Sequence, residues 1–275
     1  MDLQNKPSVI VKLIAGLGNQ LFMAAAAFCV GEAHECPVYL CNEQDNKHNL
    51  LKLDYRDTVF KYLGTKIPHN LVLTGYKHYQ HPDFEPWHVS QLTPPIVLGG
   101  FFQFISNIEV NEEEVRSKIL KGLDETRLRM KERYNINFAE TAFLHVRRGD
   151  YLELPEFHYN IGIEYYKKAF KVLLDNSYKK TVKKLLIFTD DVKWVKDQPD
   201  LMNLCDVHLV DGLNEVEALA LMTLCEAGAI CANSTFSWWG AFLGCYESRE
   251  APICVPSKWI NMKVYNLIPS SWFIL

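Results

Sequence analysis

The second half of the chain alternates short apolar runs, which are typical of buried strands, with segments of helical periodicity. Lys184–Thr189 is a nearly continuous apolar run, and Ile163–Asp175 before it repeats apolar residues at helical spacing. Strands separated by helices in this way pair in parallel, with helices on both faces of the sheet. The alternation therefore predicts an α/β fold. Further strands are expected at residues 141–147, 207–210, 227–232 and 252–255, and further helices from residue 191, from 214 to 225 and at 237–244.

The first half shows the same alternation with a weaker signal. The β-branched run at residues 9–15 predicts a buried strand that ends at the turn Gly16-Leu17-Gly18. Asn19 is then placed to cap a helix that continues to about Val30. Other strands are expected at residues 38–41, 71–74 and 96–101.

A charged region separates the two halves. Glu112–Tyr134 is expected to be helical, as one helix or as two that break near Gly122. A chain of 275 residues is too long for one ordinary core and suits two domains. The boundary is expected after the charged region, which gives domains of residues 1–138 and 139–275.

Charge and hydrophobicity exclude several classes of partner. The formal net charge is −4, which argues against the general basic surface that a nucleic acid or an anionic membrane requires. The longest apolar stretch near the N-terminus, residues 21–30, is far shorter than the ~20 residues of a spanning helix. It also lacks the basic region that precedes the core of a signal peptide. A soluble protein without a transmembrane segment is expected.

Positive charge is concentrated where the strand at residues 141–147 ends. Side chains alternate along a strand, so His145 and Arg147 share one face, and Arg148 follows where a Gly-Asp turn begins. Guanidinium groups bind phosphate oxygens bidentately and do not deprotonate. Two of them at the carboxyl end of a parallel strand predict a clamp for a diphosphate. The alternative is that an arginine pairs with Asp150 or another carboxylate and only fixes the turn.

Two other strand ends carry polar residues that suit the same ligand. Asp190 and Asp191 follow Lys184–Thr189, where carboxylates accept hydrogen bonds from a base or a ribose, although helix capping would explain one of them. Another strand is followed by a helix start, where hydroxyl and backbone N–H groups bind phosphate oxygens. The residues there are Asn233, Ser234, Thr235 and Phe236. Asn233 also begins an N-glycosylation sequon, but its position after an apolar run favours a site residue.

The glycine turn near the N-terminus is a weaker signal. Gly16-Leu17-Gly18-Asn19 joins a strand to a helix, as in a nucleotide-binding loop, but Leu21 stands where a dinucleotide fingerprint requires a third glycine. A tight turn alone would explain the two glycines. The functional interpretation is that backbone N–H groups near Gly18 and the side chain of Asn19 face a crevice between the domains.

The carboxylates do not form a metal-binding pattern. No Asp-x-Asp sequence occurs in the chain, so the usual bridge between a metal and the phosphates of a nucleotide sugar is missing. His78, His81 and His88 are only loosely grouped, which disfavours a zinc site. No metal and no other cofactor is expected.

In this order, the motifs GLGNQLF, HVRRGDY, FTDD and NSTFSWWGA resemble glycosyltransferase family 11, the α-1,2-fucosyltransferases. The resemblance runs from Gly16 to at least Ala241, and the combination of the second and fourth motifs is specific. It implies a GT-B architecture, in which two Rossmann-like domains with parallel sheets face a cleft. It further implies that the C-terminal domain holds GDP-fucose, that transfer inverts the anomeric carbon, and that no metal is essential.

The resemblance also implies a role for each matching residue. Arg147 and Arg148 would contact the donor diphosphate as catalytic groups. Independently of the resemblance, Asp150 is a candidate general base because it is adjacent to the two arginines, although it would equally orient an arginine. Asp190 would lie near the guanosine, and residues 234–236 would hold phosphate and fucose. The donor-binding set is Gly18, Asn19, His145, Asp190, Asp191, Asn233, Ser234, Thr235 and Phe236.

The acceptor and the exact donor stay open. Met23-Ala24-Ala25 departs from the Gln-Tyr-Ala sequence common after GNQLF in this family, which puts acceptor choice in doubt more than donor choice. The expected reaction is transfer of L-fucose from GDP-fucose to a galactoside hydroxyl in α-1,2 linkage. The alternatives are another GDP-deoxyhexose such as GDP-rhamnose, or a catalytically idle protein that binds GDP-sugars or glycans. The expected location is the cytoplasm of a bacterium or a virus-infected cell, or the Golgi if an anchor has been removed.

Overall fold

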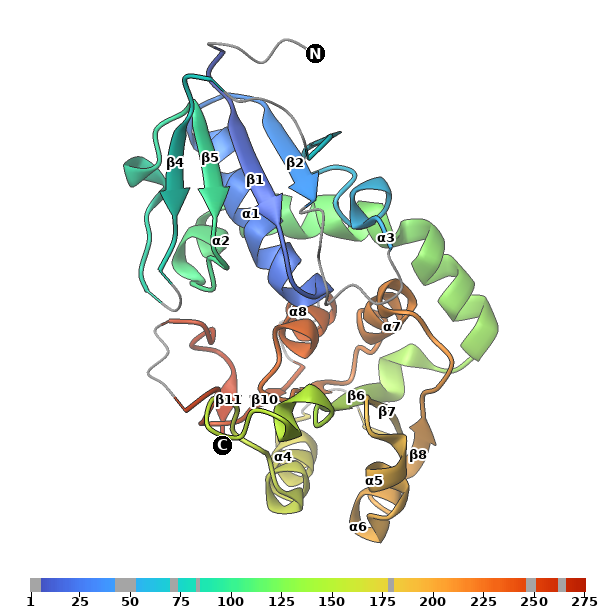
Figure 1. The fold of residues 1–275 in the computed structure, drawn as a ribbon. Coiled ribbons are helices and arrows are strands. Elements are labelled where there is room, and N and C mark those ends of the chain that lie inside the picture. The colour runs from blue at the N-terminus through green and yellow to red at the C-terminus, as the bar shows by residue number, and fades with distance from the viewer. Residues whose placement is uncertain are drawn as a thin grey trace. The chain divides into compact units, whose positions relative to one another are not determined.

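The chain separates into two compact units (Figure 1). The N-terminal unit holds residues 1–124 and 264–269, and the C-terminal unit holds residues 125–263 and 270–275. The division falls inside a helix, before the boundary at 138/139 that the sequence suggests. A continuous helix has no local break in its sequence pattern, so the sequence does not indicate a division at this point. The structure, a computed structural model, describes residues 6–42, 53–69, 74–82, 85–177, 181–245, 251–261 and 266–275.

A five-stranded parallel sheet organises the N-terminal unit. The predicted strands near residues 9, 38 and 96 are confirmed, and two further strands flank them. These two were not expected because their residues are largely exposed and polar; the expected strand at 71–74 falls mostly outside the described residues. The order across the sheet is β3 (Thr65–Ile67), β2 (Val38–Asn42), β1 (Val9–Leu13), β5 (Ile96–Gly99) and β4 (Lys77–Gln80).

Helix α1 (Leu17–Ala33) follows β1 and is buried along most of its length. The expectation that Asn19 caps this helix is wrong. Ala15 adopts a left-handed φ of 63°, and Gly16 is the N-cap, so the chain turns early and the helix begins two residues before Asn19. Asn19 therefore lies in the first turn, where its Oδ1 accepts a hydrogen bond from Gln103 Nε2 at 3.0 Å.

The charged region is one continuous helix, α3 (Glu112–Tyr134), which follows the short α2 (Ser106–Val110). Gly122 does not break it. A Cβ atom at this position would lie 2.5 Å from the carbonyl oxygen of Thr58 and 2.8 Å from that of Val59. The glycine is therefore needed for close approach of the helix to another segment of the N-terminal unit, not for a turn.

A six-stranded parallel sheet organises the C-terminal unit. The five strands expected from the sequence are confirmed, and the two-residue β11 at the sheet edge was not expected. The order is β11 (Phe273–Ile274), β10 (Ile253–Val255), β9 (Ala229–Ile230), β6 (Thr141–Val146), β7 (Lys184–Thr189) and β8 (Asp206–Leu209).

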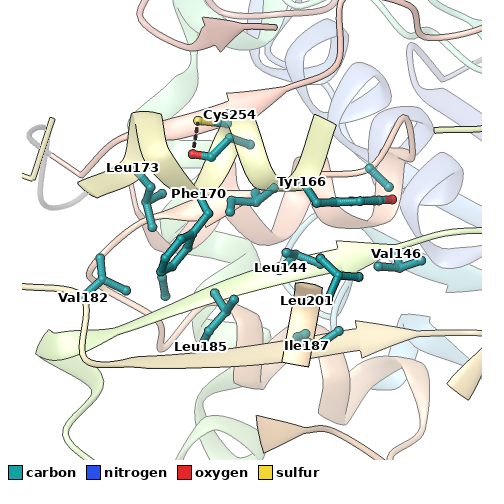
Figure 2. Packing of buried hydrophobic residues seen from close by; sticks show 14 of the residues in the cluster. Leu144, Val146, Tyr166, Phe170, Leu173, Val182, Leu185, Ile187, Leu201 and Cys254 are labelled. Atoms are coloured by element: carbon teal, nitrogen blue, oxygen red, sulfur yellow. Dashed lines mark hydrogen bonds between the residues drawn. The ribbon is translucent and has the colours of Figure 1, made fainter. Parts of the chain in front are cut away.

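Helices cover both faces of this second sheet, as the alternation predicts (Figure 1). One face packs on α4, whose Phe170 and Leu173 meet Leu144 and Leu185 of the strands in one apolar cluster (Figure 2). The side chains that alternate with Leu144 along β6 point to the opposite face, where His145 meets Phe236 of α8. The helices are α4 (Ile163–Asp175), α5 (Val192–Lys196), α6 (Pro199–Met202), α7 (Glu215–Met222) and α8 (Thr235–Gly244). Single 3-10 turns occupy Tyr55–Asp57, Val89–Gln91, Phe138–Glu140 and Asp150–Leu152.

Two further sequence expectations concern apolar residues. Trp238 and Trp239 are fully buried and pack edge to face with each other, and Trp239 packs in the same way on Phe242, so they belong to the core, as expected. Among the described residues, no helix has both the length and the apolar character needed to cross a membrane.

Candidate functional site

Three neighbouring parallel strands of the C-terminal unit end at one edge of its sheet. Val146 of β6 is in register with Thr189 of β7, and Leu144 of β6 is in register with Ile230 of β9. The segments that leave these strands are residues 147–152, 190–191 and 231–236, which contain most of the candidate residues. Parallel pairing therefore brings residues from three distant parts of the sequence to the edge where α/β proteins bind their ligands.

Arg147 is held between two carboxylates. Its guanidinium is 2.7 Å from Asp150 and 3.1 Å from Asp190, and it also lies 5.4 Å above the ring of Tyr151. Burial alone would lower the pKa of Arg147, but the carboxylates of Asp190 and Asp150 outweigh it and raise the pKa. The guanidinium is thus a permanent positive charge.

Arg148 is held on the other side of the same loop. Its Nε lies 3.2 Å from Asp191, and its guanidinium stacks 4.2 Å above the ring of Trp194. Its backbone N–H donates to Asp190 at 2.9 Å. Asp190 therefore contacts both arginines, and Asp191 also accepts from the backbone N–H of Trp194 as the cap of α5. The capping alternative considered for one aspartate thus holds for Asp191.

This cluster, which we call the arginine clamp, consists of Arg147, Arg148, Asp150, Asp190 and Asp191. Its formal charge is −1, because three carboxylates face two guanidiniums. The structure pairs both arginines with carboxylates, which is the alternative that the sequence left open for an arginine of this loop. The sequence did not identify Asp190 and Asp191 as the further partners, and it assigned them to a base, a ribose or a helix cap.

Gly149 allows this arrangement to form. A Cβ atom at Gly149 would lie 2.8 Å from Oδ2 of Asp190, the oxygen that pairs with Arg147. Any larger residue must therefore displace a carboxylate that holds the clamp together. The Gly-Asp turn after the arginines is a steric requirement of the site.

His145 contributes a neutral imidazole beside the clamp. Its side chain is 6% exposed, and burial together with the charge of Arg147 lowers its pKa to about 3. Its ring lies 5.8 Å from that of Phe236, and its Nδ1 has no hydrogen-bond partner among the described residues. A buried polar atom without a partner is costly, so this imidazole is a candidate for a ligand contact.

The start of helix α8 lies at the same edge. Ser234 is its N-cap, and the Ser234 hydroxyl accepts from the backbone N–H of Phe236 at 3.3 Å. Thr235 and Phe236 form the first turn and are partly exposed. The first turn of a helix concentrates backbone N–H donors and partial positive charge, which suits an anionic oxygen.

Asn233 has a structural role that its sequence position did not reveal. Its Nδ2 donates to the backbone carbonyls of Tyr159 and Trp259, both at 2.8 Å, and the side chain is 1% exposed. The residue therefore ties two loops together, and only its Oδ1 lacks a partner among the described residues. The buried amide also fits the expectation that the sequon is not a glycan attachment point.

Two aromatic residues of the site were given no role in the sequence analysis. Tyr151 donates its hydroxyl to the carbonyl of Asn233 at 3.0 Å and stacks on His158; burial raises the pKa of Tyr151 to about 12, so the phenol stays protonated. Trp194 supports the guanidinium of Arg148. Tyr151 lies within the HVRRGDY motif, and Trp194 follows Asp191 by about one helical turn. Their positions beside the candidate residues could therefore have identified both as parts of the site.

The remaining candidates belong to the N-terminal unit. Gly18 is buried in the first turn of α1, and Asn19 is half-buried and bonded to Gln103. Their assigned contact with the donor stays a prediction. Within the described part of the chain, no group of three or more His, Cys, Asp or Glu side chains is arranged to hold a metal ion.

Comparison with known proteins places this geometry in a family. The model of glycosyl transferase family 11 matches residues 66–250. Two proteins of Escherichia coli are similar in sequence: the O-antigen biosynthesis glycosyltransferase WbnK, 34% identical over 150 residues, and an α-1,2-colitosyltransferase, 27% identical over 152 residues. Each match covers 50% of this chain and 45% or 48% of the relative, so the chain spans about half the length of these relatives.

Solved structures show a similar fold. The α-1,6-fucosyltransferase NodZ soaked with GDP-fucose matches with a TM-score of 0.53 at 15% identity, covering 87% of this chain and 93% of NodZ. NodZ from Bradyrhizobium in another structure gives a TM-score of 0.55 at 14% identity, covering 87% and 94%. Identity this low is informative about fold only, and the fold is GT-B, built from two Rossmann-like units with parallel sheets. Together with the family match, which spans more than half of the sequence, this shows that the chain belongs to glycosyl transferase family 11.

Proposed function

We propose that this protein transfers L-fucose from GDP-fucose to a galactoside hydroxyl, forming an α-1,2 linkage with inversion of the anomeric carbon. The observation that carries the proposal is the arginine clamp beside the start of α8, at the carboxyl edge of a parallel sheet. Two guanidiniums and a helix N-terminus match the charge and the oxygens of a nucleoside diphosphate. The family and the GT-B fold support a nucleotide-sugar donor.

In this proposal, the donor diphosphate replaces the carboxylates of the clamp. The side chains of the three ion pairs are between 19% and 48% exposed, and pairs at such positions contribute about 1 kcal/mol or less. Phosphate oxygens offer each guanidinium a bidentate, charge-assisted contact, which is stronger. The aspartates thus keep the arginines oriented before the donor binds and release them at low cost. Asp190 and Asp191 are then free to accept hydrogen bonds from the guanosine.

The same groups act in the reaction step. Attack of the acceptor hydroxyl at the anomeric carbon breaks the bond to the β-phosphate oxygen, and negative charge grows on the departing GDP. Arg147, Arg148 and the N–H groups of α8 are fixed before this charge develops, which is how an enzyme stabilises a transition state. His145 stays neutral and offers Nδ1 to the donor without adding charge. No step requires a metal, and we propose a metal-independent transfer.

Asp150 is the candidate that accepts the proton of the acceptor hydroxyl. It is half-exposed, so an acceptor can reach it, but it also pairs with Arg147 at 2.7 Å. Displacement of Arg147 by the diphosphate would free this carboxylate at the moment when the donor is bound. Replacement of Asp150 by Asn separates the two roles. If Asp150 is the base, the variant should have a lower kcat, whereas if it orients Arg147, the variant should mainly have a higher KM for the donor.

A second donor has specific support. One of the E. coli relatives is an α-1,2-colitosyltransferase, so transfer of a deoxyhexose other than fucose is the second candidate. A catalytically idle binding protein is the third possibility from the sequence, and the presence of a leaving-group clamp argues against it.

One experiment decides among the three. The full chain is incubated with GDP-fucose, GDP-rhamnose and GDP-colitose, in competition and one at a time, with a panel of galactosides, and products are identified by mass spectrometry. Transfer of fucose with GDP release supports the proposal, and preference for another sugar selects the second candidate. GDP-sugar binding with no product from any donor overturns the proposed activity.

A further inference from the structure

The loop after the arginine clamp exposes an unusual number of large apolar side chains. Eight such side chains are exposed in the described part of the chain, and half of them lie within this one loop. They are Leu152, Leu154, Phe157 and Tyr159, which are 45%, 48%, 37% and 37% exposed. Single exposed apolar residues are ordinary, whereas a local group of them marks a binding surface.

The backbone of this loop is fixed at several points. Asn261 donates its Nδ2 to the carbonyls of Pro155 and Glu156 at 3.0 and 3.3 Å, and its backbone N–H to that of Phe157 at 2.9 Å. Asn233 holds the carbonyl of Tyr159. The apolar side chains are therefore presented on a preorganised backbone, which lowers the cost of ordering a binding surface.

A continuous series of ring contacts joins the clamp to the loop. The guanidinium of Arg147 lies over Tyr151, whose ring stacks on His158 with centroids 3.8 Å apart and planes 6° from parallel. The ring of His158 in turn meets Phe157 edge to face at 4.9 Å. Phe157 is thus the exposed end of a stack that begins at the proposed diphosphate site, and Tyr159 follows it on the same loop.

We infer that Phe157 and Tyr159 form a platform for a hexose of the acceptor glycan, an inference that rests on the proposed function. A pyranose has apolar C–H faces and a rim of hydroxyl groups. Flat aromatic rings match the first, and the ammonium group of Lys258, which lies 5.0 Å from the centre of the Tyr159 ring, donates hydrogen bonds to the second.

The size of the surface also favours a sugar over a protein. A stable protein interface buries about 800 Å² on each partner. Four partly exposed side chains on one short loop fall well below this area. A small ligand instead needs a few apolar side chains with a few polar groups placed beside them.

The test compares Phe157→Ala and Tyr159→Ala with wild type in the full chain, using lactose as the acceptor probe. We expect each variant to raise the KM for lactose by roughly tenfold, while the Kd for GDP stays at its wild-type value. Phe157→Leu keeps an apolar side chain but not a flat ring, and it should also raise this KM. The control is Leu174→Ala, which removes an exposed apolar side chain from α4 and should leave the KM for lactose unchanged.

Binding of lactose is measured separately from transfer, by saturation-transfer difference NMR on the GDP complex. Signals from the galactose ring protons that vanish in Phe157→Ala support the platform. Wild-type KM values and NMR signals in both alanine variants overturn it, as does a loss of GDP affinity equal to the loss for lactose. A wild-type chain that binds no GDP overturns the proposed function instead, so the two failures are distinguishable.

Discussion

The two units share one architecture and differ in the loops at the ends of their strands. Each is a parallel sheet with helices, and in each the first strand in the sequence is central. In the C-terminal unit, that strand, β6, ends in two arginines that three aspartates surround. In the N-terminal unit, β1 leads into a helix whose first turn carries no acidic residue and whose N-cap has no side-chain hydrogen bond. The charged loops, not the sheet, therefore distinguish the proposed donor site.

The largest effect is expected when the positive charge of the arginine clamp is removed. We expect Arg147→Ala and Arg148→Ala each to lower kcat by roughly 10²–10³, because each removes a donor aimed at the developing charge. Arg→Lys should restore little, since an ammonium lacks the bidentate geometry. Steady-state kinetics with GDP-fucose measure this, with Arg133→Ala, an exposed arginine of α3, as the control. A folded Arg148→Ala variant with normal turnover contradicts the assignment.

A glycine substitution tests the geometry of the clamp without removing a charge. Gly149→Ala places a Cβ atom 2.8 Å from Asp190 and should lower kcat/KM by roughly 10- to 100-fold through misplacement of Arg147. Gly162→Ala is the matched control, because a Cβ atom at Gly162 meets nothing within 4 Å. Equal activity of the two variants would show that the position of Asp190 is unimportant.

In the N-terminal unit, substitution of a closely packed glycine should lower the stability of the fold. Gly122→Ala forces α3 away from the carbonyls of Thr58 and Val59, and we expect a loss of about 1–3 kcal/mol in the free energy of unfolding. Gly16→Ala, with no atom near its added Cβ, is the control. Denaturant titration measures both, and an unchanged midpoint for Gly122→Ala would refute the packing argument.

His145 links the site to the pH dependence of stability. Its pKa is lowered to about 3 in the folded protein, so the unfolded chain binds the proton more readily, and stability falls as the pH drops from about 6.5 toward 3. Between about pH 7 and pH 5, the buried imidazole should lower the free energy of unfolding by roughly 2 kcal/mol. His145→Gln should remove this part of the pH slope. Parallel slopes for wild type and His145→Gln would contradict the burial argument.

The smallest expected effect is that of metal removal. The proposed mechanism uses only side chains and backbone N–H groups of the chain to neutralise the departing diphosphate. Treatment with EDTA should therefore leave the transfer rate unchanged, and added Mg²⁺ or Mn²⁺ should not raise it. A rate that falls with EDTA and returns with a divalent ion would show that the clamp is insufficient.

How much of the structure the sequence predicts depends on the strength of the local pattern. Ile163–Asp175 and Lys184–Thr189 have the bounds expected, because a long amphipathic helix and a buried strand have unambiguous periodicity. The strand Lys77–Gln80 was missed because it is mostly exposed and polar, so its pairing with β5 leaves no apolar signature. Tertiary contacts decide such segments, and these are not visible in one sequence.

In the candidate site, too, the sequence predicts some features and not others. The motif identified the loops, and parallel pairing of the strands brings them together. The partners of each side chain were not predictable: Asn233 binds two carbonyls that lie 74 and 26 residues away in the sequence. The charge balance of the clamp likewise depends on Asp190 and Asp191 arriving from a second strand.

The central claim is that Arg147 and Arg148 exchange their carboxylate partners for a diphosphate. The most direct measurement is a crystal structure of the protein with bound GDP. We expect both guanidiniums to contact phosphate oxygens, with the ion pair between Arg147 and Asp150 opened. GDP bound elsewhere, with all three ion pairs of the clamp intact, would contradict the account.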